Sequence, residues 1–204
     1  MAFTFFFRDT QTLDQAAKVL IPEVAGRSRI RIWDAGCAMG PEPYTLAIIL
    51  AEAMGNFSFK NLSITATDID ETNTFGKIIE EGIYPEEELK RIPQNIFQKY
   101  FEKAEGKEGY YKISDLIRNR VQFQKHDLLT LNSIGTGFSL IVCKNVLLHF
   151  QPSERIEVLK MFHSSLAADG LLANENTQKM PEELKDYFVQ VVPDAQLFRK
   201  IEVK

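Results

Sequence analysis

The positions of apolar residues along the chain follow two periods, and each period predicts a different kind of element. A run of β-forming residues at 29–33 is followed by a small, polar stretch at 34–40 that is poorly suited to continue a strand. From residue 44 onward the apolar side chains recur at helical spacing, at Tyr44, Ala47, Ile48, Ala51 and Met54. This stretch therefore predicts a strand, a turn that contains Gly36 and Gly40, and a helix.

The same order of elements continues along the chain. We expect a second strand at 62–70 and a helix at about 71–81, and two successive strand–helix units predict the start of a doubly wound parallel sheet. Further strands are predicted at 121–127, 138–143, 171–176 and 196–203, the last at an edge of the sheet with its direction left open. Helices are predicted at 13–24 and 152–166 and from Pro181 onward, and Asp169-Gly170 predicts a turn. The fold class is therefore α/β.

Residues 84–119 interrupt this alternation with a strongly charged stretch. Two aromatic segments, 97–101 and 110–113, flank a glycine-bearing turn and predict a hairpin. We therefore expect a helix and a small antiparallel element inserted into one domain that spans 29–204. Residues 1–28 hold an aromatic segment and a short helix, which we expect to pack on that core.

The composition narrows the classes of function. The net charge of −4, from 24 basic and 28 acidic residues, argues against broad binding of nucleic acid or of an anionic membrane. The two cysteines, Cys37 and Cys143, lack the spacing of a zinc site and do not form a disulfide framework, so we expect a cytoplasmic protein without a metal. No apolar run reaches the length of a transmembrane helix, and the N-terminus lacks the features of a signal peptide.

Acidic side chains stand where the predicted strands end, which indicates a nucleoside-bearing ligand with a cationic end. Asp34 and Glu42 border the glycine turn, Asp68 ends the second strand, and Asp127 ends the strand at 121–127. A carboxylate at the position of Asp68 suits a ribose, and the others suit an amino group and the adenine amine. This set favours S-adenosylmethionine. The turn at 36–40 lacks the G-x-G-x-x-G spacing, so a dinucleotide ranks well below.

Several motifs resemble those of the CheR-type chemotaxis receptor methyltransferases, in the same order. Thr4-Phe-Phe-Phe-Arg-Asp9 resembles the T-x-F-F-R-D signature, and residues 35–47 resemble A-G-C-S-T-G-E-E-P-Y-S-L-A. The match continues at 66–70, 127–129, 143–150 and 169–176, so it covers nearly the whole chain. The resemblance implies an S-adenosylmethionine-dependent enzyme that esterifies glutamate side chains of chemoreceptors. It also implies a Rossmann-like sheet with a small β-subdomain.

The resemblance assigns residues to the site. Those that it implies for the cofactor are Thr4, Arg8, Ala35, Gly36, Glu42, Asp68, Asp127, Leu128 and Asn145. Those that it implies for the acceptor and the transfer are Arg8, Lys144 and His149. Glu42, rather than Asp34, is expected to hold the amino group of the methionine. No metal and no general base are expected, because a carboxylate is already ionised at neutral pH.

Three departures from the family pattern fall close to the expected site. Pro41 replaces the first of two glutamates, Lys144 an arginine and His149 a tyrosine. Lysine keeps the charge but loses the two-pronged grip on a carboxylate, and histidine is smaller and titratable. The alternatives are therefore a non-catalytic signalling module that binds S-adenosylmethionine or S-adenosylhomocysteine, and a methyltransferase with another acceptor.

The resemblance also bears on partners and domain organisation. We expect a monomer whose partner is a chemoreceptor cytoplasmic domain or another protein acceptor, with no nucleic acid and no membrane insertion. The helical, receptor-contacting domain that precedes the catalytic domain in the family has no counterpart in this sequence. We therefore expect either a catalytic domain alone or a shorter branch of the family.

Overall fold

The computed structural model describes residues 4–175, 177 and 179–202. Its main sheet has the strand order β6-β2-β1-β7-β8-β10-β9. The bounds are β6 (Val121–Lys125), β2 (Leu62–Asp68), β1 (Ile30–Ala35), β7 (Phe138–Cys143), β8 (Leu166–Asn174), β10 (Leu197–Lys200) and β9 (Phe188–Gln190). The first five are parallel, and β10 and β9 are added antiparallel. The predicted α/β class with a mostly parallel sheet is confirmed.

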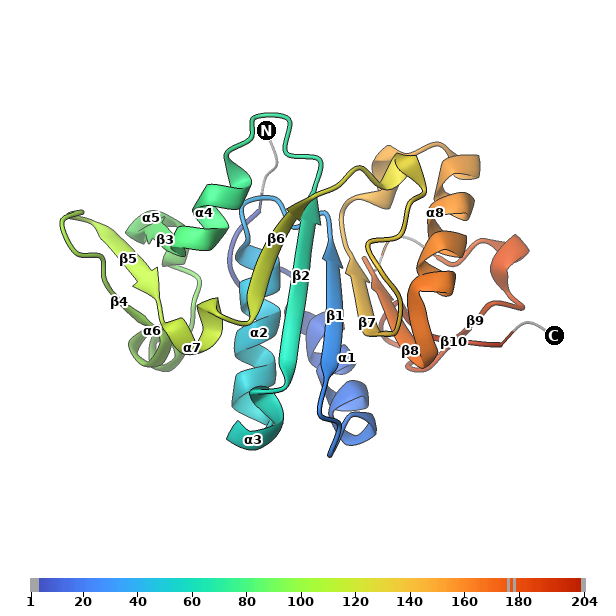
Figure 1. Ribbon diagram of the computed structural model, residues 1–204, viewed down its shortest axis with the longest axis horizontal. Coiled ribbons are helices and arrows are strands. Elements are labelled where there is room, and N and C mark those ends of the chain that lie inside the picture. The colour runs from blue at the N-terminus through green and yellow to red at the C-terminus, as the bar shows by residue number, and fades with distance from the viewer. Residues whose placement is uncertain (1–3, 176, 178, 203–204) are drawn as a thin grey trace.

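Helices cover both faces of this sheet (Figure 1). The helices are α1 (Thr10–Glu23), α2 (Pro41–Ala53), α3 (Asn56–Phe59), α4 (Phe75–Glu81), α5 (Glu86–Leu89), α6 (Gln94–Tyr100), α7 (Asp115–Arg118) and α8 (Pro152–Ser165), with 3₁₀ turns η1 (Leu128–Thr130), η2 (Leu147–His149) and η3 (Glu182–Leu184). Helices α1 and α2 contribute to one apolar core, whereas α8 packs on the other face around Trp33, Phe138 and Phe162. Every residue of β7 is buried, as expected of a central parallel strand.

The strand order reverses next to β1, and this determines where a ligand can bind. The chain runs outward from β1 through β2 to β6 and then returns to place β7 on the other side of β1. In open α/β sheets, ligands bind at the carboxyl ends of the strands beside such a switch point. The loops after β1 and β7 therefore frame the expected binding crevice.

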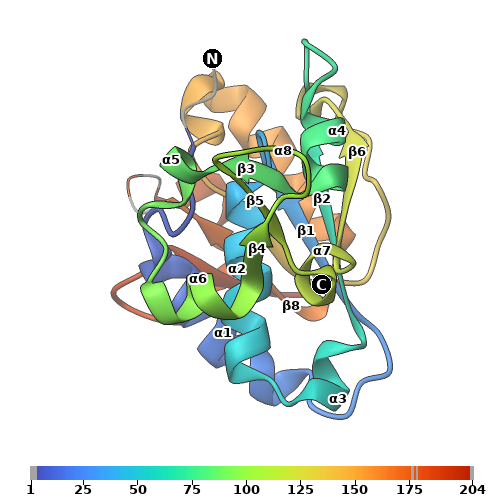
Figure 2. The same ribbon diagram turned by 90° about the vertical axis from the view of Figure 1, so that its left-hand side faces the viewer.

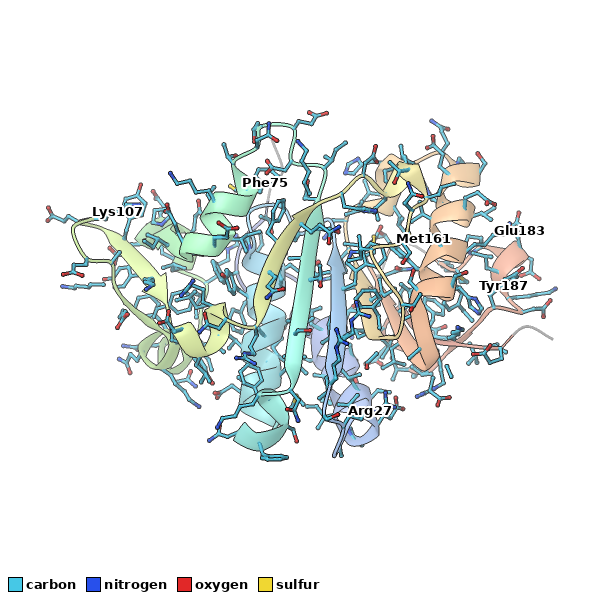
Figure 3. All side chains as sticks on the ribbon, in the orientation of Figure 1. Arg27, Phe75, Lys107, Met161, Glu183 and Tyr187 are labelled. Atoms are coloured by element: carbon cyan, nitrogen blue, oxygen red, sulfur yellow. The ribbon has the colours of Figure 1, made fainter. Side chains whose placement is uncertain are left out.

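A small antiparallel sheet with the order β3-β5-β4 lies beside the main one (Figure 2). Its strands are β3 (Ile83–Pro85), β5 (Tyr110–Ile113) and β4 (Phe101–Lys103). The predicted antiparallel insertion is confirmed, although residues 97–100 belong to α6 and only Phe101 begins a strand. Lys107 lies at the tip of the hairpin, which projects away from the main sheet (Figure 3).

The N-terminal segment is held against the body of the domain by both its side chains and its backbone. Phe6 is buried, with its ring edge-on to Tyr84 and Phe101 at centroid distances of 4.9 and 5.7 Å. The backbone N–H of Phe7 donates to Oγ1 of Thr45 on α2 at 3.0 Å. These contacts place residues 4–9 over the start of α2.

Two predictions near the C-terminus are wrong. Pro181 does not begin a long helix: a single 3₁₀ turn is followed by β9, because Phe188 is buried in a strand that pairs with β10. The closing strand β10 is antiparallel but internal, since β9 forms the edge. Asn176 and Val203, which the predicted strands include, lie outside the described residues.

Two predicted boundaries also shift. Asp169-Gly170 does not separate two elements, since β8 runs through it with an irregular register against β7. Helix α4 begins only at Phe75, because the Asp70 carboxylate accepts hydrogen bonds from the backbone of Thr74 and Phe75 and thereby sets the start of the helix. Among the residues described, no helix has both the length and the apolar character needed to cross a membrane.

Candidate functional site

A cavity of about 630 Å³ opens at the carboxyl edge of the parallel strands, within the size range usual for small-molecule sites. Its lining includes all the predicted site residues except Ala35: Thr4, Arg8, Gly36, Glu42, Asp68, Asp127, Leu128, Lys144, Asn145 and His149. Ala35 is buried in β1 immediately before the turn. The fold therefore brings side chains from the N-terminal segment, α2 and four strand ends to one cavity.

The turn between β1 and α2 depends on Gly36 for its close packing. Its φ of +96° is in the left-handed region, and a Cβ there would lie 2.1 Å from Cγ2 of Val146. The N–H of Gly36 donates to the carbonyl of Thr67 at 2.7 Å, which ties the ends of β1 and β2 together. Any larger residue at position 36 would push apart the two loops that frame the cavity.

Asp68 is fixed by the backbone on both of its oxygens. Oδ2 accepts from the N–H of Ala38 at 2.9 Å and Oδ1 from the N–H of Asp70 at 3.1 Å. Each carboxylate oxygen has a second lone pair, so the group can still accept hydrogen bonds from a ligand. The two backbone contacts hold the carboxylate at the cavity wall in one orientation, as binding of a ribose diol requires.

Asp127 and Leu128 form the part of the wall contributed by the end of β6. Oδ1 of Asp127 accepts from the N–H of Leu129 at 2.9 Å and caps the 3₁₀ turn η1. The cap accounts for one oxygen of the carboxylate, and Leu128 adds an apolar surface beside it. A carboxylate next to an apolar wall suits the amine edge and the face of an adenine.

Glu42 and Lys144 form an ion pair inside the cavity. Nζ of Lys144 lies 3.1 Å from Oε2 of Glu42 and also donates to the carbonyl of Asp9 at 3.1 Å. The side chain of Lys144 is only 2% exposed and that of Glu42 is 15% exposed. Burial raises the pKa of Glu42, while the charges of Lys144 and Arg8 oppose that shift. The motifs do not predict this ion pair, because Glu42 and Lys144 lie far apart in the chain.

Asp34 is buried and does not line the cavity, although the sequence predicts a carboxylate that borders the glycine turn at this position. It is 0% exposed, and neither of its carboxyl oxygens has a hydrogen-bond partner among the described residues. Burial, reinforced by the charge of Glu42, raises the pKa of Asp34 well above its ordinary value, although Lys144 opposes this. Desolvation therefore disfavours the charged form of this carboxyl group, which does not line the cavity.

Asn145 and Glu175 connect the ends of β7 and β8. Asn145 has a φ of +60°, and its N–H donates to Oε2 of Glu175 at 3.1 Å. Burial raises the pKa of Glu175, while the hydrogen bond from Asn145 and the charges of Arg155 and Lys144 oppose the shift. Glu175 was not among the predicted site residues, although it lies at a strand end and within the stretch 169–176 that resembles the family.

Arg8 lies on a strained part of the N-terminal segment. Its neighbours Phe7 and Asp9 both have positive φ values, of 58° and 43°. Such conformations cost about 1–3 kcal/mol each and persist only where surrounding contacts impose them. Arg8 lines the cavity and lies 5.7 Å from the ring centroid of Phe5, whose ring also stacks with Arg91 at 3.8 Å. The segment thus places a guanidinium beside the cavity.

His149 lies in η2 as an exposed residue at the cavity lining, next to the apolar side chain of Leu148. His126 also lines the cavity; its Nε2 lies 2.8 Å from the carbonyl of Asn132, and its ring packs edge-on to Trp33. His149 is thus presented to a ligand, whereas His126 is held in the framework. Among the described residues, no cluster of potential ligands could hold a metal ion.

The donor set fits S-adenosylmethionine. A carboxylate fixed by the backbone is available for the ribose, a second lies beside an apolar wall for the adenine, and Glu42 is available for the amino group. The cavity is also large enough for a ligand of this size. The one feature that does not follow from this fit is the ammonium of Lys144 on Glu42.

Comparison with known proteins identifies the family of this arrangement. The family described as "CheR methyltransferase, SAM binding domain" matches residues 2–195. The chain belongs to this family. The CheR-family chain is 32% identical over 178 residues to a chemotaxis protein methyltransferase of Borreliella burgdorferi, which covers 83% of this chain and 61% of the relative. A chemotaxis protein methyltransferase of Listeria innocua is 32% identical over 170 residues, which covers 82% of this chain and 61% of that relative.

The CheR-family chain therefore spans about three-fifths of the length of these curated relatives. Among solved structures, magnesium protoporphyrin IX methyltransferase from Synechocystis, with S-adenosylmethionine bound, is similar with a TM-score of 0.50 and 18% identity. The alignment covers 93% of this chain and 77% of that structure. This likeness confirms the predicted Rossmann-like methyltransferase fold. The family match confirms the predicted cofactor, S-adenosylmethionine.

Proposed function

We propose that this chain is the catalytic domain of a cytoplasmic enzyme that transfers a methyl group from S-adenosylmethionine to glutamate side chains of chemoreceptors. The observation that carries the proposal is one cavity lined by three carboxylates, Glu42, Asp68 and Asp127, together with Arg8 and His149. We assign the carboxylates to the cofactor and the two other residues to an acceptor. The family match supports methyl transfer. The printed names of the curated relatives support an acceptor in chemotaxis.

The residues of the cavity divide the work of binding. Asp68, held by two backbone N–H groups, would accept the ribose hydroxyls. Asp127 would accept from the adenine amine with the oxygen that does not cap η1, and Leu128 would pack on the ring. Glu42 would take the amino group of the methionine. Thr4 and Gly36 line the remaining wall, where a small side chain or none leaves room for the ligand.

The chemistry requires orientation rather than acid–base catalysis. S-adenosylmethionine supplies a sulfonium-bound methyl group that a carboxylate oxygen can displace in line. A glutamate carboxylate is already ionised at neutral pH, so no residue has to remove a proton from it. Arg8 would hold one oxygen of the acceptor carboxylate and leave the other free to attack. Holding two reactants in such an arrangement can lower a barrier by about 7–11 kcal/mol.

The proposal is tested by incubating the protein with methyl-labelled S-adenosylmethionine and a chemoreceptor cytoplasmic fragment. We expect label on the fragment that mild base releases as methanol, because carboxyl methyl esters hydrolyse under these conditions. A fragment with its acceptor glutamates changed to alanine is the matched control. Base-stable label would indicate another acceptor group, such as a nitrogen, and would contradict glutamate esterification.

A non-catalytic module that binds S-adenosylmethionine or S-adenosylhomocysteine is the second candidate. The observation that favours it is the buried Lys144–Glu42 ion pair. In this pair the positive charge of Lys144, which an acceptor carboxylate would need, is already bound to Glu42. Pro41 and His149 add to it, since both depart from the family pattern near the cavity. Tight cofactor binding without transfer to any receptor fragment would favour this second candidate over the enzyme.

A further inference from the structure

Glu42 already carries an ammonium group from within the chain. The Nζ of Lys144 lies 3.1 Å from its Oε2, and only 2% of the lysine side chain is exposed. The ε-ammonium of a lysine and the α-ammonium of an amino-acid ligand are the same chemical group. Lys144 therefore occupies, in the structure as it stands, the place that the proposed function gives to the amino group of the cofactor.

Two ammonium groups cannot share Glu42 without a penalty. Like charges a few ångströms apart repel strongly beside side chains as buried as these two. Asp34 is poorly placed to relieve this repulsion, because it is fully buried, does not line the cavity, and has a pKa that desolvation raises. The amino group of a ligand must therefore bind against the charge of Lys144, or Lys144 must find another partner.

Glu175 is such a partner. Its Oε2 accepts from the backbone N–H of Asn145, the residue next to Lys144, at 3.1 Å. Its Oε1 is buried and has no hydrogen-bond partner among residues 4–175, 177 and 179–202. The charge of Glu175 acts on Glu42 and that of Lys144 acts on Glu175, in keeping with the contact of Glu175 to the residue next to Lys144. A buried carboxylate oxygen without a partner is unfavourable, and an ammonium would satisfy it.

We propose that Lys144 is an exchangeable counterion, which pairs with Glu42 in the absence of ligand and moves to Glu175 when an amino-acid-bearing ligand takes Glu42. The proposal rests on the proposed function only for the presence of an S-adenosyl ligand in the cavity. It makes Lys144 and Glu175 positioning residues that determine how strongly the site selects the amino-acid part of that ligand. The adenosine part binds on the other wall and is indifferent to the exchange.

The test compares two probes by calorimetric titration at one pH. S-adenosylhomocysteine carries the amino acid, whereas 5′-methylthioadenosine keeps the adenosine and the sulfur but lacks it. We expect Glu175→Gln to weaken binding of S-adenosylhomocysteine roughly tenfold, a usual size for coupled sites, with little effect on 5′-methylthioadenosine. We expect Lys144→Met to tighten binding of S-adenosylhomocysteine by a similar factor, since the competing cation is gone.

The double variant Lys144→Met/Glu175→Gln tests whether the two residues act through each other. If Glu175 acts by receiving Lys144, Glu175→Gln has no further effect once Lys144 is methionine, and the two changes are strongly non-additive. Weaker binding of S-adenosylhomocysteine by Lys144→Met would overturn the proposal, as would equal losses for both probes in Glu175→Gln. Lys160→Met, on an exposed residue of α8, controls for loss of one positive charge.

Thermal melts are recorded for each variant, because Lys144 also donates to the carbonyl of Asp9. If Lys144→Met does not fold, the isosteric Glu175→Gln decides the matter by its effect on the two probes. No acceptor is present in these titrations, so an error in the proposed acceptor leaves the affinities unchanged. Failure of the wild-type protein to bind either probe would overturn the cofactor site and this proposal together.

Discussion

The two sides that we propose for the cavity, one for the cofactor and one for the acceptor, are built in different ways. On the cofactor side, Asp68 and Asp127 are held by backbone N–H groups from the loops that follow β1, β2 and β6. On the acceptor side, Lys144 is held by another side chain and by a carbonyl of the N-terminal segment, and Arg8 lies within that segment. The first side is therefore set by strand ends, and the second by contacts between distant parts of the chain.

Two of the departures from the family pattern, Lys144 and His149, lie on the proposed acceptor side. A carboxylate held by the backbone depends on few other residues, so it can persist while its surroundings change. The arrangement around Lys144 depends on Glu42 and Asp9, and on Asp34 and Glu175 behind them. We therefore expect changes on the acceptor side to alter transfer or selectivity, and changes on the cofactor side to alter affinity.

The largest effect is expected for Arg8→Ala. Methyl transfer should fall by about 100-fold or more, because the acceptor carboxylate loses its positioning cation, while the thermal midpoint stays close to that of the wild type. Initial rates of methyl transfer to a receptor fragment measure the loss, and thermal melts measure the midpoint. Arg91→Ala is the matched control, since Arg91 stacks on the same Phe5 ring but is not part of the cavity lining. Turnover of Arg8→Ala at the wild-type rate would remove Arg8 from the mechanism.

Asp68→Asn should have the next largest effect, and it tests the cofactor side. The amide cannot accept from both Ala38 and Asp70, and it loses the negative charge that strengthens hydrogen bonds to a ribose. We expect binding of S-adenosylhomocysteine to weaken by about 2 kcal/mol, measured by calorimetry. The binding of 5′-methylthioadenosine should weaken to the same degree, since it shares the ribose. A loss confined to S-adenosylhomocysteine would place Asp68 at the amino acid instead.

Asp34→Asn should stabilise the fold in a pH-dependent way. The pKa of Asp34 is raised from 3.8 on folding, mainly by burial, so the folded state keeps a proton that the unfolded state releases. The free energy of unfolding of the wild type therefore falls as pH rises above about 4, until the folded-state pKa is passed. The free energy of unfolding of Asp34→Asn does not fall in this way, because the amide does not titrate. Near neutral pH the variant should therefore be more stable than the wild type, on the order of 1 kcal/mol.

Urea unfolding of Asp34→Asn at several pH values measures this difference, and the exposed Asp186→Asn is the control. The gain should disappear as the pH falls below about 4, where the carboxyl group becomes protonated in the unfolded state as well as in the folded state. A gain that is equal at all pH values would show that Asp34 is not neutral in the folded protein.

The smallest effect is expected for Asp127→Asn. Its amide oxygen can still cap η1 through the N–H of Leu129, and its amide nitrogen adds a hydrogen-bond donor. We expect the affinity for S-adenosylhomocysteine to change by less than about fivefold, since one neutral hydrogen bond contributes about 1 kcal/mol. A large loss would show that the negative charge of Asp127, rather than its acceptor geometry, holds the ligand.

Much of the fold could be predicted because its signals are local. The glycine turn at 36–40 and the apolar run of β7 each specify their own element within a few residues. The helix predicted from Pro181 was wrong because the spacing of Leu184, Tyr187 and Phe188 suits a helix face as well as a 3₁₀ turn followed by a strand. Only the pairing with β10 decides between them, and that pairing is a tertiary contact.

The candidate site, like the fold, could be predicted only where its signals are local. The predicted carboxylates at strand ends line the cavity, because parallel strands bring their carboxyl ends to one edge. The burial of Asp34 and the pairing of Glu42 with Lys144 could not be predicted from the motifs, since both depend on how loops from β1, β7 and the N-terminus meet. The roles given to Arg8, Lys144 and His149 stay predictions until transfer is measured.

The most direct test of the central claim follows the methyl group itself. The protein is incubated with methyl-labelled S-adenosylmethionine and a chemoreceptor cytoplasmic fragment, and the labelled fragment is treated with mild base. We expect label on the fragment and its release as methanol. Binding of S-adenosylhomocysteine together with an unlabelled fragment, or with label that mild base does not release, would contradict it.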